Sequence, residues 1–200
     1  MNSKTFKINE IFYSLQGEGF HTGTASVFVR LSGCNLQCSF CDTQHESGTF
    51  MTTSQIIDEV MKYPQAPLLV LTGGEPSLFI DEEFIATLKA CTHKQITIET
   101  NGTHALPKGI DWVTLSPKQA FDGGDSHPCL LTHCNELKVV YRGQDLSQYN
   151  NIEAQHHFLQ PCYVDDAKQR RRNIQACVQA VLDHPQWRLS LQTHRVLHIQ

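Results

Sequence analysis

The sequence lacks the features that would direct it to a membrane or to nucleic acid. No apolar stretch approaches the roughly 20 residues that a membrane-spanning helix needs, and the polar start Met1-Asn2-Ser3-Lys4 is unlike a signal peptide. Basic residues are too few for broad binding to a phosphate backbone, since 16 Lys and Arg stand against 20 Asp and Glu and the formal net charge is −4. The run Arg170-Arg171-Arg172 is therefore interpreted as the solvated side of a helix. We expect neither a membrane nor nucleic acid as a direct partner.

The chain also lacks a low-complexity linker that would divide it. Its 200 residues are enough for a substantial core, and we expect a single domain over residues 1–200. Eight cysteines stand in a chain without a signal peptide, which is typical of the reducing cytoplasm. Thiols in that compartment serve as metal ligands or as small core residues, and we place the protein there.

Three of the cysteines, Cys34, Cys38 and Cys41, form a C-x3-C-x2-C motif. Three closely spaced thiolates can hold three irons of a [4Fe-4S] cluster and leave the fourth iron without a protein ligand. Such an iron can bind a small molecule and pass an electron to it. Two other interpretations stay open on spacing alone: a zinc site completed by His45 or a distant cysteine, and three buried structural cysteines.

Apolar runs that alternate with amphipathic stretches predict an α/β fold. The predicted strands are residues 25–31, 67–71, 95–99, 112–115, 136–141 and 156–160. Predicted helices begin at a capping box of Thr52 and Gln55, at Asp81, and at Asp165 or Asp166. The third helix has the apolar stripe Ile174, Cys177, Val178, Val181 and Leu182 and ends before Pro185. A complete eight-unit barrel needs about 250 residues. We therefore predict a partial, open β/α barrel of about six parallel strands.

Polar motifs follow the predicted strands at the ends where active sites of such folds gather. Thr72-Gly73-Gly74-Glu75-Pro76 follows the second strand, and its glycines let the backbone pass close to a ligand without a Cβ clash. Glu99-Thr100-Asn101-Gly102 follows the third strand, and Ser116-Pro117-Lys118 follows the fourth. Gln160 and Pro161 end the last strand. Each motif offers polar groups for a ligand, and each is also compatible with a simple turn.

The cysteine triplet and the Gly-Gly-Glu-Pro element, one β/α unit apart, together resemble the radical S-adenosylmethionine (SAM) enzymes. The resemblance implies that Cys34, Cys38 and Cys41 hold a [4Fe-4S] cluster, whose open iron chelates SAM and splits it to a 5′-deoxyadenosyl radical. The Gly-Gly backbone and Glu75 would receive the ammonium of the SAM methionine. The residues implied for SAM are Phe40, Cys41, Asp42, Gly74, Glu75, Glu99, Asn101, Ser116, Pro117, Lys118 and Gln160.

The N-terminal segment narrows the resemblance. By composition Gln16-Gly17-Glu18-Gly19 would be a solvated turn. The string from Phe12 to Gly19 nevertheless closely resembles the 7-carboxy-7-deazaguanine synthases, as do Cys41-Asp42-Thr43, residues 136–141 and residues 187–194. Those enzymes convert 6-carboxy-5,6,7,8-tetrahydropterin to 7-carboxy-7-deazaguanine with loss of ammonia. They regenerate SAM, need Mg²⁺ and feed queuosine-type tRNA modification.

This second resemblance implies further roles. The pterin would be held by Leu15, Gln16, Gly17, Arg30 and Thr72, with Gln200 in a C-terminal tail that closes the site. Arg30 suits the substrate carboxylate, because a guanidinium binds a carboxylate through two parallel hydrogen bonds. Thr43 would ligate Mg²⁺, which keeps water and substrate ligands beside a few protein oxygens. His194 is a candidate acid or base by its chemistry alone. The resemblance also implies a homodimer and an electron donor such as flavodoxin.

Some observations favour other interpretations. His127, Cys129, His133 and Cys134 would supply a second metal site, but their spacing fits no common zinc module. One rival function is another small radical SAM enzyme, such as a glycyl-radical activase, which would leave Arg30 and the Gln16-to-Gly19 string without a role. The other is a non-catalytic zinc or iron–sulfur module, which the alternating buried strands fit poorly. Cys91, Cys162 and Cys177 are expected to be thiols without a role.

Overall fold

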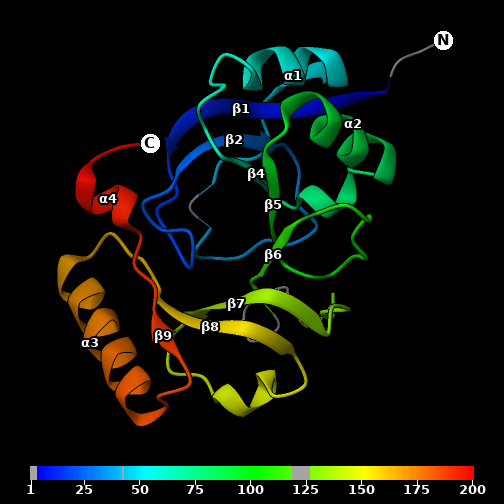
Figure 1. The fold of residues 1–200 in the computed structure, drawn as a ribbon. Helices are drawn as coiled ribbons and strands as arrows, with labels where there is room; N and C mark the ends of the chain where they lie inside the picture. The colour runs from blue at the N-terminus through cyan, green and yellow to red at the C-terminus, as the bar shows by residue number, and fades with distance from the viewer. Residues whose placement is uncertain (1–3, 42, 119–126) are drawn as a thin grey trace.

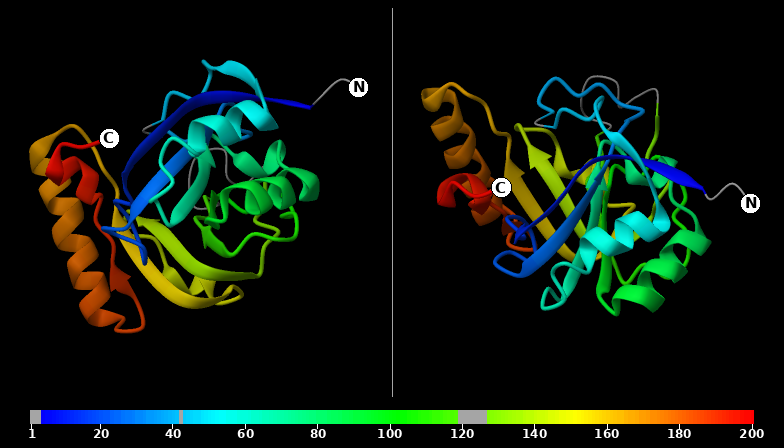
Figure 2. Two further views of the ribbon diagram at one scale, coloured as in Figure 1. Left: turned by 45° about the horizontal axis from the view of Figure 1, so that its top comes forward. Right: turned by 90° about the horizontal axis from the view of Figure 1, so that it is seen from above.

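The computed structural model describes residues 4–41, 43–118 and 127–200. Within these residues nine strands form one sheet in the order β3-β1-β2-β4-β5-β6-β7-β8-β9. The sheet curves around a hollow, with the helices on its outer side (Figures 1 and 2). No helix of the described residues is both long enough and apolar enough to cross a membrane.

The elements have the following bounds. The strands are β1 (Thr5–Leu15), β2 (Ala25–Leu31), β3 (Thr49–Thr52), β4 (Leu68–Gly73), β5 (Gln95–Thr100), β6 (Trp112–Leu115), β7 (His133–Tyr141), β8 (Glu153–Pro161) and β9 (Arg188–Leu189). The helices are α1 (Thr53–Val60), α2 (Glu82–Thr92), α3 (Ala167–Asp183) and α4 (Thr193–Leu197). Two 3₁₀ turns, η1 (Pro76–Leu78) and η2 (Leu146–Tyr149), lie between them.

The prediction of an open barrel of parallel strands is confirmed. The six predicted strands correspond to β2 and to β4 through β8, and each is parallel to its neighbour in that order. Three further strands were not predicted. The longest is β1, which pairs antiparallel with β2 and β3. Its sequence alternates polar and apolar residues, and only Phe6 and Ile8 are buried, so it shows no continuous apolar run.

The helix starts are as predicted, but the apolar sides are only partly so. Thr52 and Gln55 form the capping box of α1, and Asp81 and Asp166 accept hydrogen bonds from the first turns of α2 and α3. In α3, Cys177 is buried, whereas Ile174, Val178 and Leu182 are exposed, so that no other part of the described chain covers that side of the helix. The predicted stripe is therefore a surface feature for most of its length.

Strand periodicity separates the core from the site. Side chains alternate between the two faces of a strand, and one set packs beneath the helices: Val27, Val29, Leu31, Leu69, Leu71, Ile96, Ile98, Leu115, Leu137, Val139 and Leu159. The other set faces the hollow and becomes polar toward the ends of the strands. Strand pairing places Arg30 beside Thr72 and Thr114 between Glu99 and Glu136. The functional side chains therefore share one face of the sheet.

Candidate active site

One cavity of about 750 Å³ opens at the C-terminal ends of the parallel strands. Ligand pockets usually span about 300–1,000 Å³, so this volume can hold a cofactor and a substrate together. Its lining includes Cys34, Cys38, Leu15, Gln16, Gly17, Arg30, Thr43, Thr72, Gln200, Phe40, Cys41, Gly74, Glu75, Glu99, Asn101, Ser116, Lys118 and Gln160. Pro117 is buried behind this lining, and Asp42 lies outside the described residues. The structure thus gathers the predicted residues around one space.

The cysteine triplet lies in the loop between β2 and β3, at one side of the cavity. Cys34 and Cys38 are partly exposed and Cys41 is exposed. Burial raises the pKa of the Cys34 thiol, and the charges of Glu75, Cys38 and Cys41 raise it further against a hydrogen bond from the Leu36 N–H. The three thiols are therefore electrostatic neighbours. Their donor chemistry fits a [4Fe-4S] cluster, although no three His, Cys, Asp or Glu side chains of the described residues already converge as a metal site.

The two glycines after β4 pack against the start of the cysteine loop. A Cβ on Gly74 would lie 2.1 Å from the Gly33 carbonyl oxygen and 2.9 Å from the Cβ of Cys34. Gly73 has a φ of +136°, and a Cβ there would meet the Leu31 carbonyl oxygen at 2.1 Å. These glycines are thus required first by close contact between two stretches of backbone. That contact fixes the position of Cys34 relative to the end of β4.

Glu75 is tied into the protein by its own neighbours. Its Oε1 accepts hydrogen bonds from the Ser77 N–H at 3.0 Å and the Thr100 hydroxyl at 2.7 Å, and its Oε2 accepts one from the Asn101 N–H at 2.7 Å. The residue is 1 % exposed. A carboxylate has about four acceptor positions, so one remains for a ligand. Glu75 therefore joins the ends of β4 and β5, and its predicted contact with the SAM ammonium stays a prediction.

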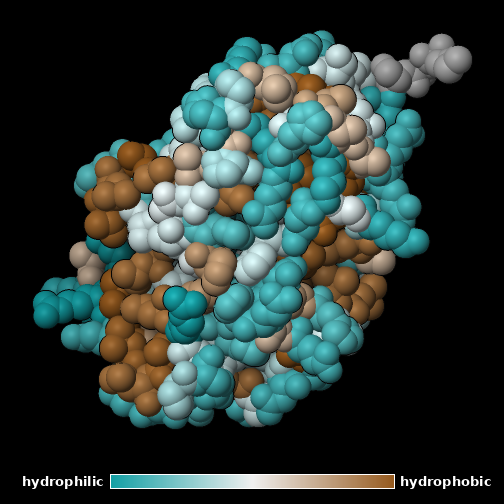
Figure 3. Space-filling model, viewed as in Figure 1, coloured by the Kyte–Doolittle hydropathy of each residue, from teal (hydrophilic) through white to brown (hydrophobic). Residues whose placement is uncertain are grey.

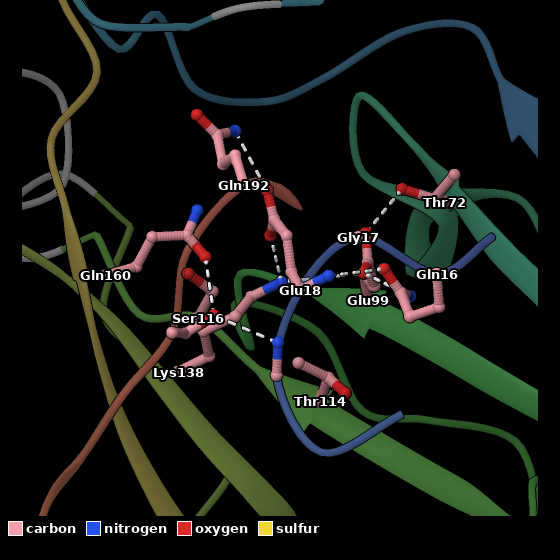
Figure 4. Close-up of polar contacts among 12 residues, drawn as sticks. Gln16, Gly17, Glu18, Thr72, Glu99, Thr114, Ser116, Lys138, Gln160 and Gln192 are labelled. Carbon is pink, nitrogen blue, oxygen red and sulfur yellow. Dashed lines mark hydrogen bonds and ion pairs between the residues drawn. The ribbon is translucent and has the colours of Figure 1, made fainter. Parts of the chain in front are cut away.

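Four side chains form a polar group at the bottom of the cavity, which we call the floor: Gln16, Glu18, Glu99 and Lys138 (Figure 4). Lys138 Nζ lies 2.5 Å from Glu18 Oε2 and 3.5 Å from Glu99 Oε1. Gln16 Nε2 donates to Glu99 Oε1 at 3.2 Å, and the Thr72 hydroxyl donates to Glu99 Oε2 at 3.0 Å. Glu99, expected beside SAM, is therefore bonded to two residues predicted to hold the pterin.

Burial and charge together set the protonation of the floor. Burial opposes ionisation of Glu18, but the charge and hydrogen bond of Lys138 outweigh it and lower the pKa of Glu18 to about 2. Burial likewise opposes the charge on Lys138, and Glu18, Glu99 and Glu136 outweigh it and raise the pKa of Lys138. Glu18 and Lys138 are therefore a charged pair at neutral pH.

Arg30 has protein partners at one side of the cavity. Its Nε donates to Glu10 Oε1 at 2.8 Å, and its Nη1 donates to the Thr43 hydroxyl at 3.3 Å. Glu10 also accepts a hydrogen bond from Gln200 Nε2 at 2.7 Å. The residue predicted for the substrate carboxylate is thus bonded to the residue predicted for Mg²⁺, and Glu10 links both to the chain end.

The remaining strand ends hold one another in place. Asn101 Nδ2 donates to Asn35 Oδ1 at 3.2 Å, which ties β5 to the cysteine loop. Lys118 Nζ folds back on the Ser116 carbonyl and hydroxyl oxygens at 2.7 and 2.6 Å, and burial lowers the pKa of Lys118. Gln160 Oε1 accepts a hydrogen bond from the Ser190 hydroxyl at 3.0 Å. These groups line the cavity while supporting its wall.

The C-terminal segment packs against the N-terminal motif. The Thr193 N–H and hydroxyl both donate to the Gly17 carbonyl oxygen at 2.9 Å. Gln192 Nε2 donates to Glu18 Oε1 at 2.8 Å, and Ser14 Oγ donates to the Gln200 carbonyl oxygen at 2.6 Å. His194 also lines the cavity, and a Cβ on Gly17 would lie 2.2 Å from its Nδ1. Gly17 therefore allows this segment to lie directly over the motif.

The second metal site considered for His127, Cys129, His133 and Cys134 does not form among the described residues. His133 instead pairs with Glu153 on the surface at 3.0 Å. Burial raises the pKa of Cys134 to about 12, as expected for a thiol beside the core.

Comparisons with known proteins agree with this geometry. Residues 28–127 match the family model of the radical SAM superfamily. The chain is 56% identical over 194 residues to the 7-carboxy-7-deazaguanine synthase of Bacteroides thetaiotaomicron, covering 97% of this chain and 98% of that protein.

The chain belongs to the 7-carboxy-7-deazaguanine synthase family. The 7-carboxy-7-deazaguanine synthase of Caulobacter vibrioides is 38% identical over 96% of this chain and 98% of its own length. The crystal structure of QueE from Escherichia coli matches with a TM-score of 0.71 at 26% identity, over 94% of this chain and 93% of that one. The chain is therefore a radical SAM enzyme, a class that uses a [4Fe-4S] cluster and SAM. Neither a glycyl-radical activase nor a non-catalytic zinc module agrees with this family.

Sequence reasoning missed several polar residues around the family's motifs. Glu18 and Lys138 form the ion pair of the floor, although neither was singled out. A signal existed for Lys138, because Glu136 and Lys138 are charged residues two apart in an otherwise apolar strand and must share a face. Glu10 had no such signal, because β1 itself was not predicted.

Proposed function

We propose that this protein converts 6-carboxy-5,6,7,8-tetrahydropterin to 7-carboxy-7-deazaguanine with release of ammonia, for queuosine-type 7-deazaguanine pathways. The observation that carries the proposal is that one cavity is lined by the cysteine triplet and by the charged floor. Members of the family are named for this product. A radical can reach the substrate only if the cluster and the pterin share one space, and the common cavity supports this arrangement.

The floor suits the aminopyrimidine edge of a pterin, which carries several hydrogen-bond donors. Glu99 is the partly exposed carboxylate of the floor, and Gln16 and Thr72 hold its two oxygens in place. The pterin would therefore meet an acceptor that is already oriented, which reduces the ordering that binding requires. Leu15 and Gly17 would cover the pterin from the side of β1.

Arg30 would bind the substrate carboxylate, supported by Glu10. The Glu10 carboxylate holds the Nε side of the guanidinium at 2.8 Å, so that the rest of the fork is oriented. Thr43, bonded to the same guanidinium, would ligate Mg²⁺ through its hydroxyl oxygen. An oxygen donor fits this hard cation, which retains water or substrate oxygens for most of its six positions. Arg30 and Mg²⁺ would then both bind the carboxylate of the substrate.

Cys34, Cys38 and Cys41 would hold the [4Fe-4S] cluster, and SAM would lie between it and the ends of β4 to β8. When bound, the cluster and SAM supply the carbon radical that removes a hydrogen atom from the substrate. The chain's own contribution is to orient the two partners and to exclude water. Phe40, Gly74, Asn101, Ser116, Pro117, Lys118 and Gln160 would shape the SAM side of the cavity, with Glu75 as its acceptor for the ammonium.

We further propose a homodimer formed through the exposed apolar side of α3 and α4. Leu182, Val196 and Leu197 are 70%, 72% and 56% exposed, and Ile174 and Val178 extend the patch along α3. Figure 3 shows apolar side chains gathered over this part of the surface. Large exposed apolar patches typically mark interfaces. Sedimentation of the wild-type protein and of Leu182→Lys would test the proposal, since the lysine should yield monomers.

The remaining parts of the proposal concern the domain organisation, the electron donor and the cellular compartment. The chain would act as a single domain, in which the N-terminal segment binds substrate and the C-terminal tail closes the site. The tail is already bonded to Gly17 and Glu18, which supports closure over the floor. A small electron donor such as flavodoxin would reduce the cluster. Cluster cysteines and five further free thiols suit a reducing cytoplasm.

The test is an anaerobic assay of the iron-reconstituted protein with SAM, Mg²⁺, a strong reductant and 6-carboxytetrahydropterin. Mass spectrometry should detect 7-carboxy-7-deazaguanine, with SAM largely unconsumed. A brown protein that cleaves SAM but leaves the pterin intact would agree with a radical SAM enzyme and would contradict the proposed substrate.

A further inference from the structure

A second, small cavity lies on the other side of the floor. Its volume of about 10 Å³ is close to the space that one water molecule needs. Gln16, Glu18, Glu99 and Lys138 line both cavities, so the floor is their common wall. The far side of the small cavity is formed by His21, Trp112, Thr114 and Glu136, with Leu68 and Thr97. None of these far-side residues was expected to take part in function.

Three polar atoms on the far side make no hydrogen bond of normal geometry among the described residues, although the Trp112 N–H lies close enough to the Glu136 carboxyl group to lower its pKa against burial, which raises it. They are Glu136 Oε1, Trp112 Nε1 and His21 Nε2, and each is buried. Glu136 is 2% exposed and Trp112 is 9% exposed. A buried polar atom without a partner destabilises a protein by about 1–3 kcal/mol, so a molecule that bonds to these atoms from the cavity would stabilise the fold.

The backbone and the aromatic rings hold these three groups in place. Glu136 Oε2 accepts hydrogen bonds from the Phe20 N–H at 3.2 Å and the Thr114 hydroxyl at 3.4 Å. A Cβ on Gly19 would lie 1.8 Å from Glu136 Oε1, so only glycine lets the loop pack on this carboxyl group. The His21 ring meets the Trp112 ring edge-on, with centroids 4.6 Å apart. The site is therefore built before any molecule enters it.

We propose that this cavity is the binding site of one ordered water molecule, held by Glu136, Trp112 and His21 beneath the floor of the substrate pocket. The atoms available match the hydrogen-bonding capacity of water. Trp112 Nε1 can only donate, so its partner must accept. Burial and the neighbouring His156 lower the pKa of His21, which leaves a neutral ring. A water molecule would accept from Trp112 and donate to Glu136 and His21, whereas a metal cation cannot accept the indole N–H.

The water would also give Glu136 a role in the floor. Glu136 and Lys138 lie two residues apart on one face of β7, and Glu136 helps to keep Lys138 charged. Through the water and this charge, Glu136 would act as a positioning residue for Lys138 and Glu99. This part of the inference rests on the proposed function, because Glu99 is the group expected to meet the pterin.

The experiment is an anaerobic crystal structure of the wild-type protein at a resolution that shows ordered water, compared with Trp112→Phe. We expect one density peak within hydrogen-bond distance of Glu136 Oε1, Trp112 Nε1 and His21 Nε2. The peak should vanish or move in Trp112→Phe, which retains the aromatic stack but removes the donor. Trp187→Phe is the matched control, because Trp187 is the only other tryptophan, lies in the core under α3, and should leave the peak in place.

Two crystallographic results would overturn the water site: a wild-type cavity without density, or an anomalous peak there after a thallium soak, which would show a cation. Both are read from the wild-type protein, so a poorly folding variant would not prevent the test.

Kinetic measurements then test the positioning role of Glu136. Trp112→Phe should raise KM for the pterin about tenfold, equivalent to about 1.4 kcal/mol, and by more than it lowers kcat. An unchanged KM would overturn the role alone. A wild-type protein that does not turn over the pterin would overturn the proposed function and leave the density test intact.

Discussion

Replacement of Lys138 by Met should show how strongly the stability of the protein depends on the one ammonium group of the floor. The Lys138 and Glu18 side chains are only 7% and 15% exposed. Removing one partner of a buried ion pair typically costs about 3–5 kcal/mol, because the other charge is left buried and unpaired. The pKa of Glu18, lowered from 4.5 to about 2, gives a similar figure, since each pKa unit corresponds to about 1.4 kcal/mol. We expect Lys138→Met to lower the free energy of unfolding by about 3 kcal/mol at pH 7.

The pH dependence of this loss has a definite sign. The pKa of Glu18 is lower in the folded protein than in the unfolded chain, so its stabilisation is fully present above about pH 4.5 and is lost as the pH falls toward 2. Without Lys138, burial still raises the pKa of Glu18, opposed by the hydrogen bond from Gln192 and the charge of His194. The difference in unfolding free energy between the two proteins should therefore begin to shrink above pH 4.5, as Glu18 of the variant takes up a proton in the folded state, and continue to shrink below it as the wild-type ion pair is lost.

Urea unfolding under anaerobic conditions, followed by tryptophan fluorescence at pH 7 and pH 3, would measure both effects. Lys62→Met is the control, because it removes the same group from the exposed pair with Glu59 and should change nothing measurable. The double variant Lys138→Met with Glu18→Gln should recover part of the loss, because it removes the unpaired charge. A loss below about 1 kcal/mol for Lys138→Met would refute the reasoning, because it would match a surface pair.

Three further predictions concern the cavity. Cys38→Ala should abolish the brown colour and all turnover while circular dichroism stays unchanged; retained cluster absorbance would contradict its role as a ligand. Arg30→Ala should spare the cluster and SAM binding but weaken pterin binding by about 10- to 100-fold, the range expected for a hydrogen-bonded charge; an unchanged Kd would show that Arg30 does not hold the pterin. Gly74→Ala should lower the iron content per chain, because its Cβ would lie 2.1 Å from the Gly33 carbonyl oxygen and displace the loop at Cys34; iron analysis beside Gly23→Ala, whose Cβ would meet nothing within 4 Å, would check this.

The parallel part of the sheet was predictable because its helix-facing residues form apolar runs. Runs such as residues 67–71 and 136–141 are distinctive enough to identify β4 and β7 without a structure. β1 was not predictable in this way, since it lies outside the parallel series and most of its side chains are only partly buried. The two-residue strand β9 is too short to produce any pattern.

The site was predictable as a set of residues but not as a set of contacts. The family resemblance carried by the motifs implied that Glu75, Glu99 and Arg30 belong together, and all three line the cavity. Their hydrogen bonds depend on strand register, which the sequence does not reveal. Hence the bonds of Glu75 to Ser77, Thr100 and Asn101, and of Arg30 to Glu10, could be found only in the folded chain.

The contacts between the loop after β1 and strand β7 have a consequence for protein engineering. Glu18 and Lys138 are 120 positions apart, and the adjoining contact between Gly19 and Glu136 spans a similar separation. A chimera that takes its first 24 residues from a relative would therefore replace the segment with Glu18 and Gly19 while keeping their partners Lys138 and Glu136. Segment exchange within this family should transfer the N-terminal segment and β7 as one unit, even though neither is adjacent to the other in the gene.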